Sequence, residues 1–142
     1  MAGRDYVDAL PAGRTLPNTP ADLSGHARIV YTELGTGNVW DFTAPDGSID
    51  AIRVEGPLQT NSSEVVRTSV LGGLGIAYAP WWLLQDVLVG RDVRVLLPEW
   101  STRSLPMHLV SPPQRRQTAK VRAIADHVAR GLAGANEGDP MP

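Results

Sequence analysis

The sequence predicts an α/β fold in which short strands and helices alternate along the chain. From Leu58 onward the expected order is strand, helix, strand, helix, strand, strand and helix. Alternation of this kind favours a sheet with parallel strand pairs and helices on its faces. A chain of 142 residues with 42% hydrophobic composition is also long enough to bury a core of its own.

The composition argues against several classes of function. The formal net charge is −2, whereas a module that binds duplex DNA normally presents a basic face. The chain has no cysteine, which excludes disulfides, thiolate metal sites and cysteine nucleophiles. No apolar run approaches the roughly 20 residues of a membrane span, and Arg4, Asp5 and Asp8 do not fit a signal peptide. We therefore expect a cytoplasmic protein that contacts neither DNA nor a membrane.

The first half of the chain is expected to begin irregularly and then to form strands. Residues 1–18 are rich in glycine, proline and arginine and show no periodicity, which predicts an irregular lead-in. Thr19 and Pro20 are typical of the start of a one-turn helix, which Gly25 ends. Strands are expected at residues 28–31, 39–42, 49–55 and 58–60, with a Pro-Asp-Gly turn joining the middle two as a hairpin.

The glycine cluster at residues 72–75 follows an expected helix and precedes an expected strand. Ser62 or Ser63 caps that helix over residues 64–71, and residues 76–79 form the strand. A phosphate-binding loop has the reverse order, because the N-terminus of the helix must face the anion. The glycines are therefore predicted to end the helix rather than to bind phosphate.

Two further helices are expected in the C-terminal part of the chain. Pro80 opens the first, and strands at residues 93–97 and 107–110 follow it. Thr118 caps the second helix, and the polar tail after Gly134 is expected to be disordered. Apolar side chains recur at helical spacing along the second helix, at Val121, Ile124, Ala125, Val128 and Leu132.

The residues that could carry chemistry do not form a catalytic or metal-binding set. His26, His108 and His127 lack the spacing of metal ligands. No serine lies in a nucleophile elbow, and the carboxylates are scattered. We therefore expect neither an enzyme nor a bound metal or other cofactor.

Two short segments are candidates for ligand binding. Asn61 and Ser62 lie where a strand gives way to the N-terminus of a helix, which offers free backbone N–H groups and a positive dipole end. They either cap the helix or hold a small anionic ligand there. Trp81 and Trp82 are adjacent, so their side chains diverge by about 100° on a helix. One of the pair is expected to pack in the core and the other to lie at an interface or in a cleft.

A series of short motifs runs through the chain in a characteristic order. The upstream motifs are Thr19–His26, Trp40–Phe42 and Pro45–Gly47, and the downstream motifs are Leu58–Ser63, Leu71–Ala77, Pro80, Leu88–Gly90, Val95–Trp100, Pro106–Pro112 and Lys120–Arg122. This series, from about Tyr6 to Leu132, resembles the effector-binding domain of LysR-type transcriptional regulators.

The resemblance implies a type 2 periplasmic-binding-protein-like fold, in which a small-molecule effector lies between two Rossmann-like subdomains. Residues 19–103 would form most of the second subdomain, and residues 104–133 would be the strand and helix that return to an incomplete first one. Residues 134–142 would be the disordered tail. The helix-turn-helix of full members would precede Met1, so the chain resembles a truncated regulator.

By the resemblance, three pairs of residues are candidates for the effector site. They are Tyr31 and Thr32 at the end of a strand, Asn61 and Ser62 at the start of a helix, and Pro80 and Trp81 after a buried strand. The resemblance implies a small-molecule effector, expected to be a small organic acid. Because the last helix would lack its usual partners, a homo-oligomer or association with an intact regulator is expected. The alternative is a dimerisation or interaction module, a remnant with no functional ligand site.

Overall fold

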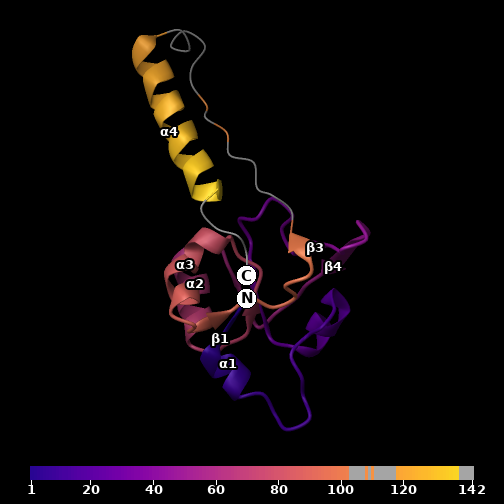
Figure 1. Cartoon of the computed structure of the whole chain (residues 1–142). Coiled ribbons are helices and arrows are strands. Elements are labelled where there is room, and N and C mark those ends of the chain that lie inside the picture. The colour runs from indigo at the N-terminus through magenta and orange to yellow at the C-terminus, as the bar shows by residue number, and fades with distance from the viewer. Residues whose placement is uncertain (103–107, 109, 111–117, 138–142) are drawn as a thin grey trace. The chain divides into compact units, whose positions relative to one another are not determined.

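The chain divides into two units, Met1–Arg103 and Ser104–Pro142, in the computed structural model (Figure 1). The structure describes residues 1–102, 108, 110 and 118–137, with residues 132–137 described by their backbone alone. No helix of the described part is long and apolar enough to cross a membrane.

The first unit is built on a mixed sheet of five strands in the order β5-β2-β6-β1-β7. Its strands are β1 (Ala2–Gly3), β2 (Arg28–Tyr31), β5 (Leu58–Thr60), β6 (Ile76–Ala77) and β7 (Val93–Arg94). β2 runs parallel to both β5 and β6, whereas β1 is antiparallel to β6 and β7. The prediction of an α/β fold with parallel strand pairs is therefore confirmed.

An antiparallel sheet in the order β4-β3-β8 contains the expected hairpin. β3 (Val39–Thr43) pairs along its whole length with β4 (Ile49–Arg53), and β8 (Ser101–Thr102) pairs with the end of β3. In the turn, Asp46 Oδ1 accepts hydrogen bonds from the backbone N–H of Ser48 at 2.9 Å and from its hydroxyl at 2.7 Å. Gly47 adopts φ 85°, a conformation that glycine reaches without strain.

Two of the helices begin as the sequence predicts. η1 (Pro20–Gly25) starts with Thr19 as N-cap, and Asp22 closes a capping box on it. α2 (Ser63–Leu71) has Ser62 as N-cap and Gly72 as C-cap. The glycine cluster at residues 72–75 thus ends a helix, as expected. Its second member, Gly73, has φ 70°, and a Cβ there would lie 2.9 Å from the Asp5 Cβ.

The core of the first unit lies on both faces of β2. Ile29 and Val30 are adjacent and both buried, so their side chains point to opposite faces of the sheet. On one face Ile29 joins residues of α2 and its neighbours, namely Val66, Val70, Ala77, Leu83, Leu84 and Val93. On the other face Val30 joins Ala2, Leu23, Trp40, Phe42, Val54, Ile76 and Leu97. β2, an interior strand between β5 and β6, is therefore anchored in the core through both of its faces.

Several segments of the first unit differ from the sequence prediction, and the strands expected at residues 49–55 and 76–79 end early, at Arg53 and Ala77. Residues 2–8, expected to be irregular, form β1 and the short helix α1 (Arg4–Asp8), because Ala2 pairs with strands far away in the sequence. The helix expected after Pro80 is interrupted at Leu84, which separates η2 (Trp81–Leu83) from α3 (Gln85–Val89). The strand expected at residues 93–97 ends at Arg94, and Leu97 adopts φ 57°.

Of the second unit, the structure describes mainly the helix α4 (Ala119–Glu137). Thr118 Oγ1 accepts a hydrogen bond from the Val121 N–H at 3.4 Å, in agreement with its predicted role as cap. The helix continues past Gly134, where the sequence predicts a disordered tail, and residues 138–142 lie outside the described residues. Of the strand expected at residues 107–110, residues 107 and 109 also lie outside them, and the described residues 108 and 110 are not in a strand.

Candidate functional site

The carboxyl ends of three parallel strands meet at one edge of the five-stranded sheet. β2 lies between β5 and β6, with Tyr31 opposite Thr60 and Ile29 opposite Ala77. The Thr32 N–H donates to the Thr60 carbonyl oxygen at 2.9 Å, which continues the pairing beyond β2. Ligands of α/β proteins bind outside the carboxyl ends of such strands.

The six residues predicted as candidates for the effector site all lie at or just after the carboxyl ends of these strands. Tyr31 and Thr32 end β2, Asn61 and Ser62 follow β5, and Pro80 and Trp81 come after β6. Thr32 and Asn61 each follow the last paired residues of β2 and β5, whereas Pro80 comes three residues after the end of β6. Asn61 and Thr32 are exposed, whereas the other four side chains are partly buried. We name these six residues the carboxyl edge.

Ser62 holds the start of α2 at the carboxyl edge. Its Oγ accepts a hydrogen bond from the Val65 N–H at 3.4 Å, and its carbonyl oxygen accepts from the Val66 N–H at 3.1 Å. Its own N–H donates to Thr60 Oγ1 at 3.1 Å. These bonds give Ser62 a structural role. The N–H groups of the first turn, those of Ser63 and Glu64, have no intrahelical acceptor and stand at the positive end of the helix dipole.

The two tryptophans differ in exposure, but neither belongs to a core cluster, so the prediction that one of them packs in the core is wrong. Trp81 is partly buried, while Trp82 is 59% exposed. The core positions of this segment are taken by Leu83 and Leu84. Trp82 is thus the more accessible aromatic surface beside the carboxyl edge, and the sequence-based choice of Trp81 passed it over. The adjacency of the pair was the only signal in the sequence that could have indicated it.

The charges next to the carboxyl edge are acidic. Residues 31–33, 61–64 and 78–82 include Glu33 and Glu64 but neither lysine nor arginine, and both glutamates are exposed. An anionic group bound to this wall would therefore rely on backbone N–H groups and neutral side chains.

Arg67, farther along α2, is engaged elsewhere. Its guanidinium forms a bidentate ion pair with Asp86 of α3, at 2.8 and 2.6 Å, and donates to the Leu83 carbonyl oxygen at 2.8 Å. The hydrogen bonds of the pair raise the pKa of Arg67 and lower the pKa of Asp86. This pair ties α2 to α3.

Replacing Ser62 by alanine is expected to lower the free energy of unfolding by about 1 kcal/mol, because the Val65 N–H loses its capping acceptor. Urea unfolding of the variant measures this loss. Ser63→Ala is the matched control, since Ser63 stands inside the helix and its substitution should change stability by less than about 0.5 kcal/mol. Equal losses in the two variants would contradict the capping role of Ser62.

Comparison with known proteins identifies the family. The model of the LysR substrate binding domain matches residues 7–133. The chain is 27% identical over 129 residues to a probable HTH-type transcriptional regulator, LtrA, of Klebsiella pneumoniae, which covers 89% of this chain and 41% of that protein. It is 32% identical over 115 residues to the HTH-type transcriptional regulator YhjC of Escherichia coli (strain K12), covering 80% and 38%. The chain thus spans about two-fifths of the length of these relatives.

Solved structures agree with this assignment. The regulatory domain of CrgA from Neisseria meningitidis has a TM-score of 0.72 at 22% identity, over 92% of this chain and 62% of that one, which shows the fold. The regulatory domain of the C227S variant of AphB from Vibrio vulnificus has a TM-score of 0.62 at 26% identity, over 72% and 52%. The relatives are transcriptional regulators rather than enzymes. The chain belongs to the LysR substrate-binding domain family, and its fold is the type 2 periplasmic-binding-protein-like fold of LysR regulatory domains.

Proposed function

We propose that the chain senses a small-molecule effector for a LysR-type regulator and that the carboxyl edge is one wall of the effector site. The observation that carries the proposal is the arrangement of this edge. Thr32 and Asn61 directly follow the paired parallel strands β2 and β5, Asn61 precedes the N-terminus of α2, and Pro80 follows the third parallel strand, β6, which supports a shared site at this edge. Family membership supports a sensing role over catalysis.

The chemistry of the wall favours an effector with a small anionic group and a flat apolar body. The N–H groups that start α2 suit a carboxylate, and Asn61 offers an exposed amide beside them. Trp82 presents an exposed ring on which an apolar or aromatic part could stack. We therefore propose that the effector is a small organic acid whose carboxylate is held by these N–H groups and by Asn61.

A second candidate function rests on α4. Its apolar side chains Val121, Ile124, Ala125 and Val128 fall at helical spacing and form one stripe. A stripe of this kind normally packs against another element, so a homo-oligomer or association with an intact regulator is a partner arrangement consistent with it. In this alternative the chain is an interaction module and the carboxyl edge holds no ligand. A cytoplasmic location accompanies either proposal.

A thermal-shift screen with small aromatic and aliphatic carboxylates tests the sensing role. A true effector should raise the melting temperature, since a ligand at 100 times its Kd adds about 2.7 kcal/mol of stability. The corresponding primary amides, which lack the charge, should have a smaller effect. Asn61→Ala should remove most of the shift, whereas Asn18→Ala, outside the carboxyl edge, should leave it intact.

The two candidate functions predict different outcomes of the screen. Stabilisation by a carboxylate that depends on Asn61 supports the effector site. No stabilisation across the panel, together with a stable dimer in light scattering, favours the interaction module and argues against sensing by this chain.

A further inference from the structure

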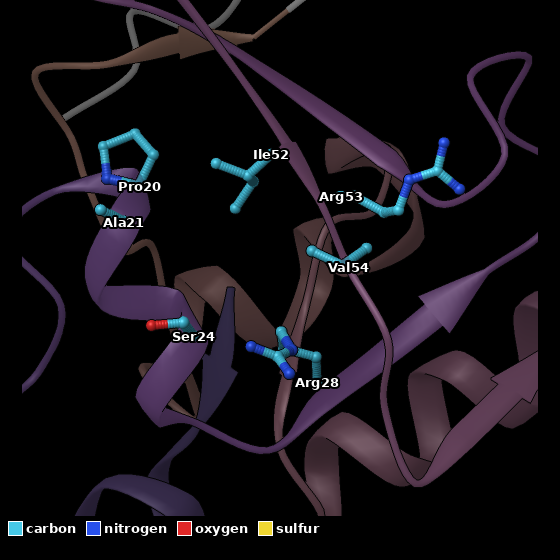
Figure 2. A pocket seen from close by; sticks show the side chains of 7 residues that line it. All are labelled: Pro20, Ala21, Ser24, Arg28, Ile52, Arg53 and Val54. Carbon is cyan, nitrogen blue, oxygen red and sulfur yellow. The ribbon is translucent and has the colours of Figure 1, made fainter.

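A hollow of about 320 Å³ lies in the first unit, at the opposite end of β2 from the carboxyl edge (Figure 2). Arg28 lines it and is the first residue of β2, whereas Tyr31 at the carboxyl edge is the last. The walls come from η1, β4 and the residue after β4, with the lining residues Pro20, Ala21, Ser24, Arg28, Ile52, Arg53 and Val54. Its volume is at the lower end of the range of small-molecule sites.

Arg28 is held in a fixed position at this hollow. Its Nε donates to the Glu55 carbonyl oxygen at 2.8 Å, and its Nη1 donates to the Leu23 carbonyl oxygen at 2.8 Å. Close backbone packing supports this arrangement, because a Cβ at Gly56 would overlap the Arg28 carbonyl. A guanidinium has five N–H donors in a planar fork, so these two bonds orient the group and leave donors for another acceptor.

No carboxylate of the described residues neutralises Arg28. The ion pairs found in the described part of the chain are Arg4 with Asp92 and Arg67 with Asp86. Asp22 of η1 uses its Oδ2 to accept from the backbone N–H groups of Asn18 and Thr19, at 3.1 and 2.9 Å, and these bonds lower its pKa. Arg28 therefore presents a preorganised cation whose partners are neutral carbonyls.

Four of the seven residues that line the hollow are apolar. Pro20 and Val54 are buried, Ile52 is partly buried, and the small side chain of Ala21 leaves the space open. Arg53 contributes little charge to the hollow, because Figure 2 shows its guanidinium directed away from the other labelled side chains. A fixed cation beside an apolar wall suits a carboxylate attached to a short apolar body.

We propose that this hollow is a second small-molecule site, which binds a monocarboxylate through the free donors of Arg28 and packs its apolar part against Pro20, Ala21 and Ile52. The site is separate from the carboxyl edge, because the two lie at opposite ends of the same strand. Its existence does not depend on the effector proposal.

Amide NMR of the labelled chain, titrated with benzoate and with benzamide, tests the proposal. Benzoate is expected to shift the amide signals of Ala21, Ser24, Arg28 and Val54 in a saturable way. Benzamide, which has the same size but no charge, should bind about tenfold more weakly, because hydrogen bonds to a charged acceptor are about twice as strong as neutral ones. Equal binding of the two compounds would overturn the assignment of Arg28 as the anchor.

Three variants locate the binding. Arg28→Lys keeps the positive charge but loses the planar array of guanidinium N–H donors, and should weaken benzoate binding about tenfold. The matched control Arg94→Lys, at an exposed position of β7 outside the hollow, should leave binding unchanged. Ala21→Phe should abolish binding by filling the hollow while leaving the bonds of Arg28 untouched, so the test does not depend on how stable Arg28→Lys is. Undiminished binding of benzoate by Ala21→Phe would overturn the proposal. Amide shifts confined to the carboxyl edge would overturn it too, but would leave the effector proposal standing.

Discussion

Replacing Trp40 by alanine is expected to lower the free energy of unfolding by about 3–5 kcal/mol, a large part of the stability of a single domain. Trp40 is 1% exposed and lies in the core cluster of Val30 and Phe42. Its ring stacks on Tyr78 with the ring centroids 5.5 Å apart, and Phe42 contacts the same tyrosine edge-on at 5.6 Å. Removal of the indole leaves a cavity between the two sheets, and urea unfolding followed by circular dichroism measures the loss.

Trp82→Ala is the matched control for this experiment. Trp82 is 59% exposed, so its truncation should change stability by less than about 1 kcal/mol. The loss of unfolding free energy for Trp40→Phe should lie between those for Trp40→Ala and Trp82→Ala. The Trp40 Nε1 atom is buried without a hydrogen-bond partner among the described residues, and phenylalanine does not carry that unsatisfied group. Similar losses for Trp40→Ala and Trp82→Ala would contradict the assignment of Trp40 to the core.

Lowering the pH from 8 to 5 is expected to destabilise a chain that has a free amino group at Met1 by about 3 kcal/mol. This amine donates to the Ala77 carbonyl oxygen at 2.7 Å. Burial lowers its pKa from 8.0 to about 5. The unfolded chain therefore binds a proton at a higher pH than the folded chain does. The stability is fully present above pH 8 and is lost progressively as the pH falls toward 5.

Protonation of His26 is also expected to lower the free energy of unfolding as the pH falls. Its Nδ1 lies 2.9 Å from the Tyr6 hydroxyl, and burial lowers the pKa of the imidazole below its ordinary value of 6.5. Protonation of His26 in the unfolded state thus adds to the loss of stability at acidic pH. Mutation of His26 to asparagine should reduce this part of the pH dependence only.

An N-acetylated chain separates the contribution of the amine from that of His26. Acetylation keeps an N–H donor for the Ala77 carbonyl oxygen but removes the proton-binding site. The slope of the unfolding free energy between pH 8 and 6.5, measured by urea titration, should fall to nearly zero after acetylation. If the acetylated and free chains lose stability at the same rate over this interval, the Met1 amine is not the titrating group.

The parts of the fold that the sequence could predict depend on local interactions. The capping box of Thr19 and Asp22, the Ser62 cap and the Pro-Asp-Gly turn involve residues within a few positions of one another. β1 has no such local signal, because Ala2 pairs with Ile76 and Arg94. The interruption at Leu84 is also tertiary in origin, since Leu84 is completely buried while the periodicity around it is helical.

The position of Asn61 and Ser62 at a strand-to-helix junction could be read from the sequence, whereas the set of six candidate residues came from the family resemblance. Strand ends followed by polar residues are visible in the sequence, and parallel pairing brings such ends to one edge. The exposure of Trp82 could not be read from the sequence, because either tryptophan of the pair satisfies the same pattern. The hollow at Arg28 could not be predicted either. It joins η1 to β4, and the carbonyl acceptors of Arg28 at Leu23 and Glu55 give no sequence signal.

The most direct test of the account is to locate the compound that stabilises the chain most strongly in the thermal-shift screen. The amide spectrum of the labelled chain should show saturable shifts at Thr32, Asn61, Ser63 and Glu64, and the indole N–H of Trp82 should move with the same Kd. This result would place the effector against the carboxyl edge and the start of α2. Shifts confined to α4, or to the hollow at Arg28, with the carboxyl edge unchanged at saturation, would contradict the account.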